Sequence, residues 1–179
     1  MIRLFRGSSV AALMGALSIS FVGSTSAQIP EETAALAAAQ AWVKAVTTRD
    51  VDAQMKLLPP TMFAKDAERD RAKQMRLHDN ERAVIKNAKF TMFGLGPPMP
   101  SIKVGKALVV VIPYKAVVDS SDGKIQTDSS LIAVALDGGS NWNVFDGSGH
   151  GARSLKTIIP GYTTGLNVPV VRSMVLKTE

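Results

Sequence analysis

The sequence predicts an α+β domain whose N-terminal helices pack in a curved antiparallel sheet. Before about residue 80 the apolar residues recur every three or four positions, and after it they recur every second position. These periods are typical of helices and strands. Asp-Gly pairs beginning at Asp122 and Asp137 lie between extended apolar runs and favour tight hairpin turns. Pro113 lies within the longest run, where proline is typical of a sheet edge or a bulge, and a bulge bends the sheet.

Residues 1–27 are typical of a cleaved secretory signal peptide. Basic residues precede the apolar run 10–22, and small residues at Thr25 and Ala27 lead to a cleavage point before Gln28. The apolar run is shorter than the roughly 20 residues that span a bilayer. We therefore expect a periplasmic or secreted protein with no membrane span after cleavage.

The amino-acid composition limits the functional groups and the net charge of the mature chain. The chain has no cysteine, which excludes disulfides, thiolate nucleophiles and cysteine metal ligands. Residues 1–27 hold two basic and no acidic residues, so cleavage lowers the formal charge from +6 to +4. This mild excess does not require a nucleic-acid partner. We expect a single domain over residues 28–165, followed by an extended C-terminal arm over 166–179.

The first helix is expected to begin at Pro30, because proline suits a first helical position. Ala35, Ala39, Trp42 and Val46 recur at helical spacing, so we expect these side chains on the buried face.

Asp50 is expected to cap a second helix, which Pro59 ends. Its predicted buried face holds Val51, Met55 and Leu58.

A third helix is predicted from Lys65 to about His78. Acidic residues lie among the basic residues of this stretch, and no aromatic residue accompanies them before Phe90. Such a pattern is typical of a solvated helix face, and it does not favour nucleic-acid binding.

Strands are predicted from about residue 87 onward. In the first strand, strict alternation places Ala88, Phe90 and Met92 on one face and Phe93 on the other. Residues 107–145 are then expected to form three strands joined by the two Asp-Gly turns.

The stretch "NWNVFDGSGHG" places Asp146, Ser148 and His150 within five positions. Catalytic triads are assembled from distant parts of a fold, so crowding of this kind argues against one. We expect a strand that ends in a glycine-rich turn, with Asp146 or Ser148 capping a short helix after it. The glycine spacing also resembles a dinucleotide loop, but Pro160 cuts the following helix short, so no such cofactor is expected.

Metal and other cofactors are not expected. His78 and His150 are the only histidines, and they are too far apart in the chain to form a two-histidine motif on one helix.

A curved sheet around a long helix leaves a mouth that suits a ligand. Tyr114 is the one polar-tipped residue on an apolar strand face, so its hydroxyl needs a partner inside. The candidate ligand-binding residues are Trp42, Met55, Met75, Phe90, Met92 and Tyr114; the alternative is that they form ordinary core. Tyr114 and Asp128 are the candidate catalytic residues.

Three stretches carry a family resemblance: "VVVIPYKAVV" over 109–118, "DGGSNWNVFDG" over 137–147 and "LKTIIPG" over 155–161. With the N-terminal helices, they resemble the nuclear transport factor 2-like superfamily, which includes ketosteroid isomerase and scytalone dehydratase. Within it, the chain is similar to uncharacterised exported bacterial members over roughly residues 30–165. The resemblance implies a cone-shaped, cystatin-like α+β fold.

The leading expectation is a non-catalytic exported domain that binds a small apolar ligand or a protein partner. One alternative is an isomerase- or dehydratase-type enzyme with an acid in the cone cavity. Another is a structural module that forms a homodimer. The fold alone does not choose among these roles.

Overall fold

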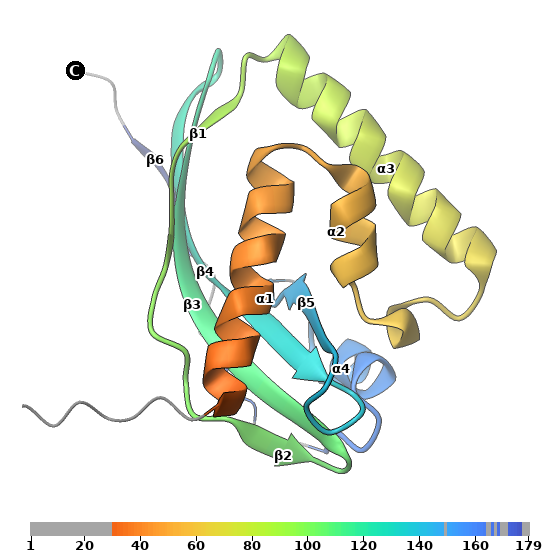
Figure 1. Cartoon of the computed structure of the whole chain (residues 1–179). Helices are drawn as coiled ribbons and strands as arrows, with labels where there is room; N and C mark the ends of the chain where they lie inside the picture. The colour runs from red at the N-terminus through yellow and green to blue at the C-terminus, as the bar shows by residue number, and fades with distance from the viewer. Residues whose placement is uncertain (1–29, 149, 164–165, 167, 169–171, 177–179) are drawn as a thin grey trace, which may run out of the picture.

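The computed structural model describes residues 30–148, 150–163, 166, 168 and 172–176 (Figure 1). The expected signal peptide and its cleavage point lie outside these residues. The described chain contains four α-helices, a short 3₁₀ helix and a six-stranded antiparallel sheet. The predicted α+β class and the order of helices before strands are therefore confirmed.

Helix α1, Pro30–Thr47, has the predicted start and most of the predicted buried stripe, since Val46 is only partly buried. Glu31 and Glu32 lie in its first turn, where the positive end of the helix dipole favours acidic residues. Ala35, Ala39 and Trp42 are buried against the sheet. Figure 1 shows the long strands bending around this helix, so α1 occupies the concave side of the sheet.

Helix α2, Val51–Leu57, begins where its cap predicts. The Asp50 side chain accepts a hydrogen bond of 2.9 Å from the backbone N–H of Ala53. Val51, Met55 and Leu58 are buried as expected. The 3₁₀ helix η1, Pro60–Met62, follows.

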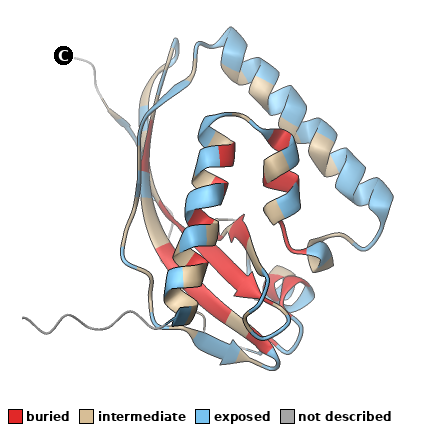
Figure 2. Ribbon diagram, viewed as in Figure 1, coloured by how far each residue is buried: buried red, intermediate tan, exposed pale blue. Residues whose placement is uncertain are grey.

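Helix α3, Asp66–Ile85, continues beyond the predicted end near residue 78. It contains no fully buried residue and packs mainly against α2 (Figure 2). The predicted solvated character of this helix is therefore confirmed.

The sheet is four strand positions wide, because each long central strand pairs with two shorter strands along its outer edge. The order is β1-β3-β4-β5, with β2 also pairing with β3 and β6 also pairing with β4. The strands are β1 Lys89–Leu95, β2 Ile102–Val104, β3 Ala107–Ser120, β4 Gly123–Ala135, β5 Trp142–Asp146 and β6 Arg172–Leu176. Strand β6 lies within the expected C-terminal arm and pairs with the first half of β4.

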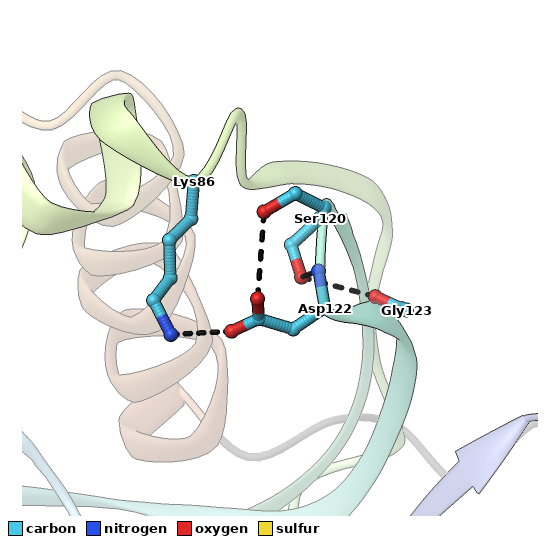
Figure 3. Close-up of polar contacts among 5 residues, drawn as sticks. Lys86, Ser120, Asp122 and Gly123 are labelled. Atoms are coloured by element: carbon cyan, nitrogen blue, oxygen red, sulfur yellow. Dashed lines mark hydrogen bonds and ion pairs between the residues drawn. The ribbon is translucent and has the colours of Figure 1, made fainter.

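Both predicted hairpins are present, but only the first closes in a tight turn, since a loop of six residues joins β4 to β5. The β3–β4 hairpin closes with Ser120 opposite Gly123, whose φ of 115° suits glycine. At the tip of this hairpin, Asp122 pairs with Lys86 at the end of α3 (Figure 3). In the other turn, the Asp137 side chain accepts hydrogen bonds from three backbone N–H groups, those of Gly139, Ser140 and Asn141.

The predicted alternation of the first strand is wrong beyond Phe90. Phe90 opposes Val118 and Met92 opposes Val117, so a β-bulge adds one residue at Thr91. The bulge reverses the facing of every residue after it. Met92 therefore lies on the face opposite to Phe90, and Phe93 lies on the same face as Phe90.

Pro113 lies in a central strand at a local gap in the pairing. Pairing of β1 with β3 ends at Tyr114, and pairing of β2 with β3 begins at Val109. The missing N–H of Pro113 therefore falls between the two short strands and removes no ladder hydrogen bond.

The two faces of the sheet carry separate cores. On the face toward α1, here called the α1 face, Val110, Ile112, Leu131, Ala133 and Val144 pack against the α1 side chains. Residues of the opposite parity form the second core with α2 and with helix α4, Ala152–Ile158. These two cores hold the strands in the register that creates the site described next.

Candidate functional site

A polar cluster interrupts the apolar α1 face at the end of β5. Tyr114 and Ser129 are directly opposite in the β3–β4 ladder, and Asp146 opposes Leu131 in the β4–β5 ladder. The Tyr114 hydroxyl donates a hydrogen bond of 2.7 Å to Oδ2 of Asp146. Oδ1 of Asp146 accepts from the Ser148 backbone N–H at 2.7 Å and from the Ser129 hydroxyl at 3.5 Å. The predicted inside partner of Tyr114 is thus Asp146.

The environment keeps the Tyr114 phenol protonated. Burial raises the pKa of Tyr114, and the hydrogen bond to the Asp146 carboxylate raises it further. A phenol with a raised pKa remains a hydrogen-bond donor throughout the physiological range. Tyr114 therefore acts as a neutral donor toward a carboxylate, or toward any acceptor that displaced it.

A cavity of about 340 Å³ adjoins this cluster. Helices α1, α2 and α3 form one side, and the start of β1, the end of β3 and the end of β5 form the other. Its wall combines apolar residues with five ionisable ones: Trp42, Val46, Arg49, Gln54, Arg76, Asp79, Asn80, Ala83, Ala88, Lys89, Phe90, Val118 and Asp146.

Arg76 reaches the cavity from α3 and is held by a buried glutamine. Nη1 of Arg76 donates to Oε1 of Gln54 at 3.2 Å, while Nε2 of Gln54 donates to the Ala45 carbonyl at 3.1 Å. Gln54 is only 5% exposed, so its amide orientation is set by these two contacts. Burial lowers the pKa of Arg76, and the charges of Asp79 and Asp146 oppose that shift. An arginine remains charged under these conditions.

Contacts at the rim join α3 to the rest of the domain. The Asn80 side chain donates to the Arg49 carbonyl at 3.3 Å, and the Arg49 guanidinium donates to the Ala88 carbonyl. Arg49 has a φ of 58°, an uncommon conformation for a non-glycine residue, in the short link between α1 and α2. These contacts place the cavity-lining side chains of α3 opposite those of α1.

Aromatic side chains build the apolar wall. Trp42 meets Phe93 edge-on with ring centroids 6.4 Å apart, and Phe93 stacks on Tyr114 at 5.0 Å. Trp42 is 6% exposed, and within the described part of the chain its indole N–H has no hydrogen-bond partner. The indole N–H is therefore a buried donor beside the cavity without an acceptor.

A wider and more open hollow of about 700 Å³ borders this cavity between the end of α1 and β1. The two share Arg49, Ala88, Lys89 and Phe90 in their linings. Only the smaller cavity reaches Arg76 and Asp146, so it is the stronger candidate for specific recognition.

The structure separates the predicted ligand-binding residues. Trp42 and Phe90 line the cavity, and Tyr114 contacts it through Asp146. Met55 belongs to the other core, and Met75 is 61% exposed on α3. These two methionines therefore do not line the cavity. Met92 lies beyond the bulge and lines the larger adjoining hollow and a third, shallow one, but not the cavity itself.

Asp128 does not join Tyr114 in one site. It opposes Lys115 in the ladder, at 3.8 Å from Nζ of Lys115 to Oδ1 of Asp128, and shares the face of that residue. Tyr114 and Asp128 both line the shallow hollow, but the Tyr114 hydroxyl is directed to Asp146 on the α1 face. The pairing of Tyr114 with Asp128 is therefore wrong, because adjacent strand residues point to opposite faces.

The residues of the Asp146, Ser148 and His150 cluster have separate environments. Ser148 meets Asp146 through its backbone, and the His150 ring packs edge-on against Phe145 at 5.3 Å. Burial lowers the pKa of His150, whereas the charge of Asp146 acts to raise it. Helix α4 has Gly151 as its N-cap with no side-chain cap, so the expected capping by Asp146 or Ser148 is wrong.

Sequence reasoning missed Asp146, Arg76 and Gln54 as cavity residues. The parity of "WNVFD" was an available signal for Asp146, since it shares a strand face with Trp142 and Val144. The sequence signal for Gln54 was weaker: it is a polar residue next to the expected buried residues of α2.

Comparison of the chain with protein-family models, curated proteins and solved structures found no match. No helix in the described ranges is both long and apolar enough to cross a bilayer. Among the same residues, no three potential metal ligands come together.

Proposed function

We propose that this chain is an exported protein that binds a small amphipathic molecule in the cavity between α1, α3 and the sheet. The observation that carries the proposal is a cavity of about 340 Å³ with an aromatic wall and a polar end. Ligand sites are typically concave, largely apolar and supplied with a few placed polar groups.

The volume limits the ligand. At about 30 Å³ for each water-sized group, the cavity accommodates on the order of eleven non-hydrogen atoms. The ligand is therefore smaller than a sterol unless it extends into the adjoining open hollow. Trp42 and Phe90 would contact its apolar part, and Arg76 and Asp146 would contact its polar part.

The cone fold of the nuclear transport factor 2-like superfamily is part of this proposal. Its support is the order of three helices before the strands and the bending of β3 and β4 around α1. Export to the periplasm or the medium is supported by the sequence pattern of residues 1–27.

Native mass spectrometry of protein purified from the periplasm of an expressing bacterium tests both parts. We expect a polypeptide mass that begins at Gln28, together with a noncovalent adduct that a Trp42→Ala variant does not retain. An intact N-terminus in the cytoplasmic fraction would contradict export. A wild-type protein without an adduct, which also fails to bind small amphiphiles in solution, would contradict the binding function.

A second candidate is acid–base catalysis of the isomerase type. The hydrogen bond between Tyr114 and Asp146 favours it, because a carboxylate beside a neutral phenol can exchange a proton with a substrate that the phenol polarises. Conversion of 3-cyclohexenone to its conjugated isomer, followed by ultraviolet absorbance, tests it. Catalysis that Asp146→Asn abolishes and Asp128→Asn preserves would support this candidate, and an absence of wild-type turnover would contradict it for this substrate class.

A further inference from the structure

Arg76 enters the cavity with most of its hydrogen-bonding capacity unused. Its guanidinium is half-buried and contacts Gln54 through Nη1. Within the part of the chain that the structure describes, no carboxylate oxygen lies within 4.0 Å of it. Because a guanidinium has five N–H donors in a fixed fork, donors remain for a ligand.

Gln54 orients the Arg76 fork without neutralising it. The buried amide must present its oxygen to Arg76, since its nitrogen donates to the Ala45 carbonyl. A glutamate at this position would pair with the guanidinium, whereas glutamine adds no charge, and Asp79 and Asp146 act on Arg76 only through their charges, without an ion pair to it. The structure therefore holds a positioned cation at the cavity wall.

Two acids line the cavity, Asp79 on α3 and Asp146 on β5, and Asp146 already has partners. Its two oxygens accept hydrogen bonds from the Tyr114 hydroxyl and the Ser148 backbone N–H. Trp42 lines the cavity, but its indole N–H is buried and has no acceptor among the residues that the structure describes. The Arg76 guanidinium is therefore the donor group at the wall that remains open to an acceptor on a ligand.

We propose that the ligand carries a carboxylate, which Arg76 binds, and an apolar chain, which lies against Trp42 and Phe90. This inference rests on the proposed small-molecule function and names the chemical class of the ligand. Planar carboxylates match the guanidinium fork and form its strongest hydrogen bonds.

Isothermal titration calorimetry of the mature chain with three probes of equal chain length tests the proposal. Octanoate has about ten non-hydrogen atoms and fits a cavity of this volume. Octan-1-ol and octylammonium replace its carboxylate with a neutral and a cationic group. We expect octanoate to bind at least about tenfold more tightly than either, a difference of about 1.4 kcal/mol.

Variants of α3 assign the preference to one side chain. Arg76→Gln should remove the preference for octanoate and leave the affinity for octan-1-ol unchanged. Arg71→Gln is the matched control, since Arg71 is exposed on the same helix and does not line the cavity. Gln54→Glu, a near-isosteric change, should also weaken octanoate binding, because the new carboxylate competes for Arg76.

The outcomes separate this inference from the function on which it rests. Equal affinity for octanoate and octan-1-ol would overturn the carboxylate class and leave the binding function standing. Preference for octylammonium would overturn it in favour of Asp146 as the anchor. If Arg71→Gln and Arg76→Gln weaken octanoate binding equally, the role of Arg76 would be overturned. Failure of all three probes to bind would overturn both proposals.

Discussion

The Tyr114 hydroxyl donates a hydrogen bond of 2.7 Å to the Asp146 carboxylate across the concave face of the sheet. The two residues are 32 positions apart and lie on β3 and β5, with β4 between them. This contact joins three strands beside the cavity and places a neutral donor against an acid.

Removal of the Tyr114 hydroxyl should destabilise the domain. Hydrogen bonds to charged groups contribute about 1.5–3 kcal/mol, and partial exposure reduces that value, so we expect Tyr114→Phe to lower the free energy of unfolding by about 1–2 kcal/mol. Urea denaturation followed by circular dichroism measures it. Tyr162→Phe is the control, since its side chain makes no hydrogen bond to another residue that the structure describes; its effect should stay within about 0.5 kcal/mol. Equal effects of the two variants would contradict the role of the contact.

Stability should fall in alkaline solution through Tyr114. Its pKa is raised in the folded state by burial and by Asp146, while an unfolded tyrosine titrates near pH 10. Above about pH 10 the unfolded chain loses this proton and the folded chain keeps it, so the stabilisation declines as pH rises further. Below pH 10 the contribution is fully present.

The difference in unfolding free energy between wild type and Tyr114→Phe, measured from pH 8 to pH 11, isolates this effect from the titration of lysines. The difference should shrink above about pH 10. A constant difference across the range would contradict a raised pKa of Tyr114.

Lys86 should hold the Asp122 carboxyl in its ionised form. The hydrogen bond from Lys86 and then its positive charge lower the pKa of Asp122, at the junction of α3 with the β3–β4 hairpin (Figure 3). A lowered folded-state pKa stabilises the fold above the unfolded value near pH 3.9, and this stabilisation is lost as pH falls through the folded pKa.

Carbon-detected NMR titration of the Asp122 carboxyl checks this pairing. We expect Lys86→Gln to raise its pKa, and added salt to raise it in the wild type but less in the variant. Lys103→Gln, a change on β2 away from the hairpin tip, should leave the Asp122 titration unchanged. An unchanged pKa in Lys86→Gln would show that the pair does not persist in solution.

Gly147 should resist substitution because other atoms fill the space of a side chain. A Cβ there would lie 3.0 Å from the Ser130 carbonyl oxygen and 3.1 Å from a methyl group of Val168. Overpacking of this kind costs about 1–3 kcal/mol, and it should also displace the adjacent Asp146. Gly151→Ala is the control, since a Cβ at Gly151 meets no atom within 4 Å. Thermal unfolding compares the two, and equal melting temperatures would contradict tight packing at Gly147.

Part of the site could be predicted from the chain. The turn at Asp122 and Gly123 sets the register of β3 against β4, since each step back along β3 is matched by one step forward along β4. That register places Tyr114 opposite Ser129 and puts Asp128 on the other face. The alternative that joins Tyr114 and Asp128 in one catalytic site is not supported by this register.

Other features depended on distant parts of the fold. The bulge at Thr91 cannot be read from alternation, because the pattern on either side of it is equally apolar. The loop of six residues between β4 and β5 sets no single register, so the position of Asp146 relative to Tyr114 depends on packing against α1.

Local sequence patterns were sufficient to predict the α+β class, the start of α1, the Asp50 cap, the positions of both hairpins and a hydrogen-bond partner for the Tyr114 hydroxyl inside the fold. These features follow from local periodicity, capping and turn chemistry, which act over a few residues. Three findings required the folded structure: the partner of Tyr114 is Asp146, Gln54 orients Arg76 at the cavity, and Met75 and Met92 do not line that cavity. Each of those contacts joins elements far apart in the chain, and their relative placement is set by burial of two cores on opposite faces of one sheet.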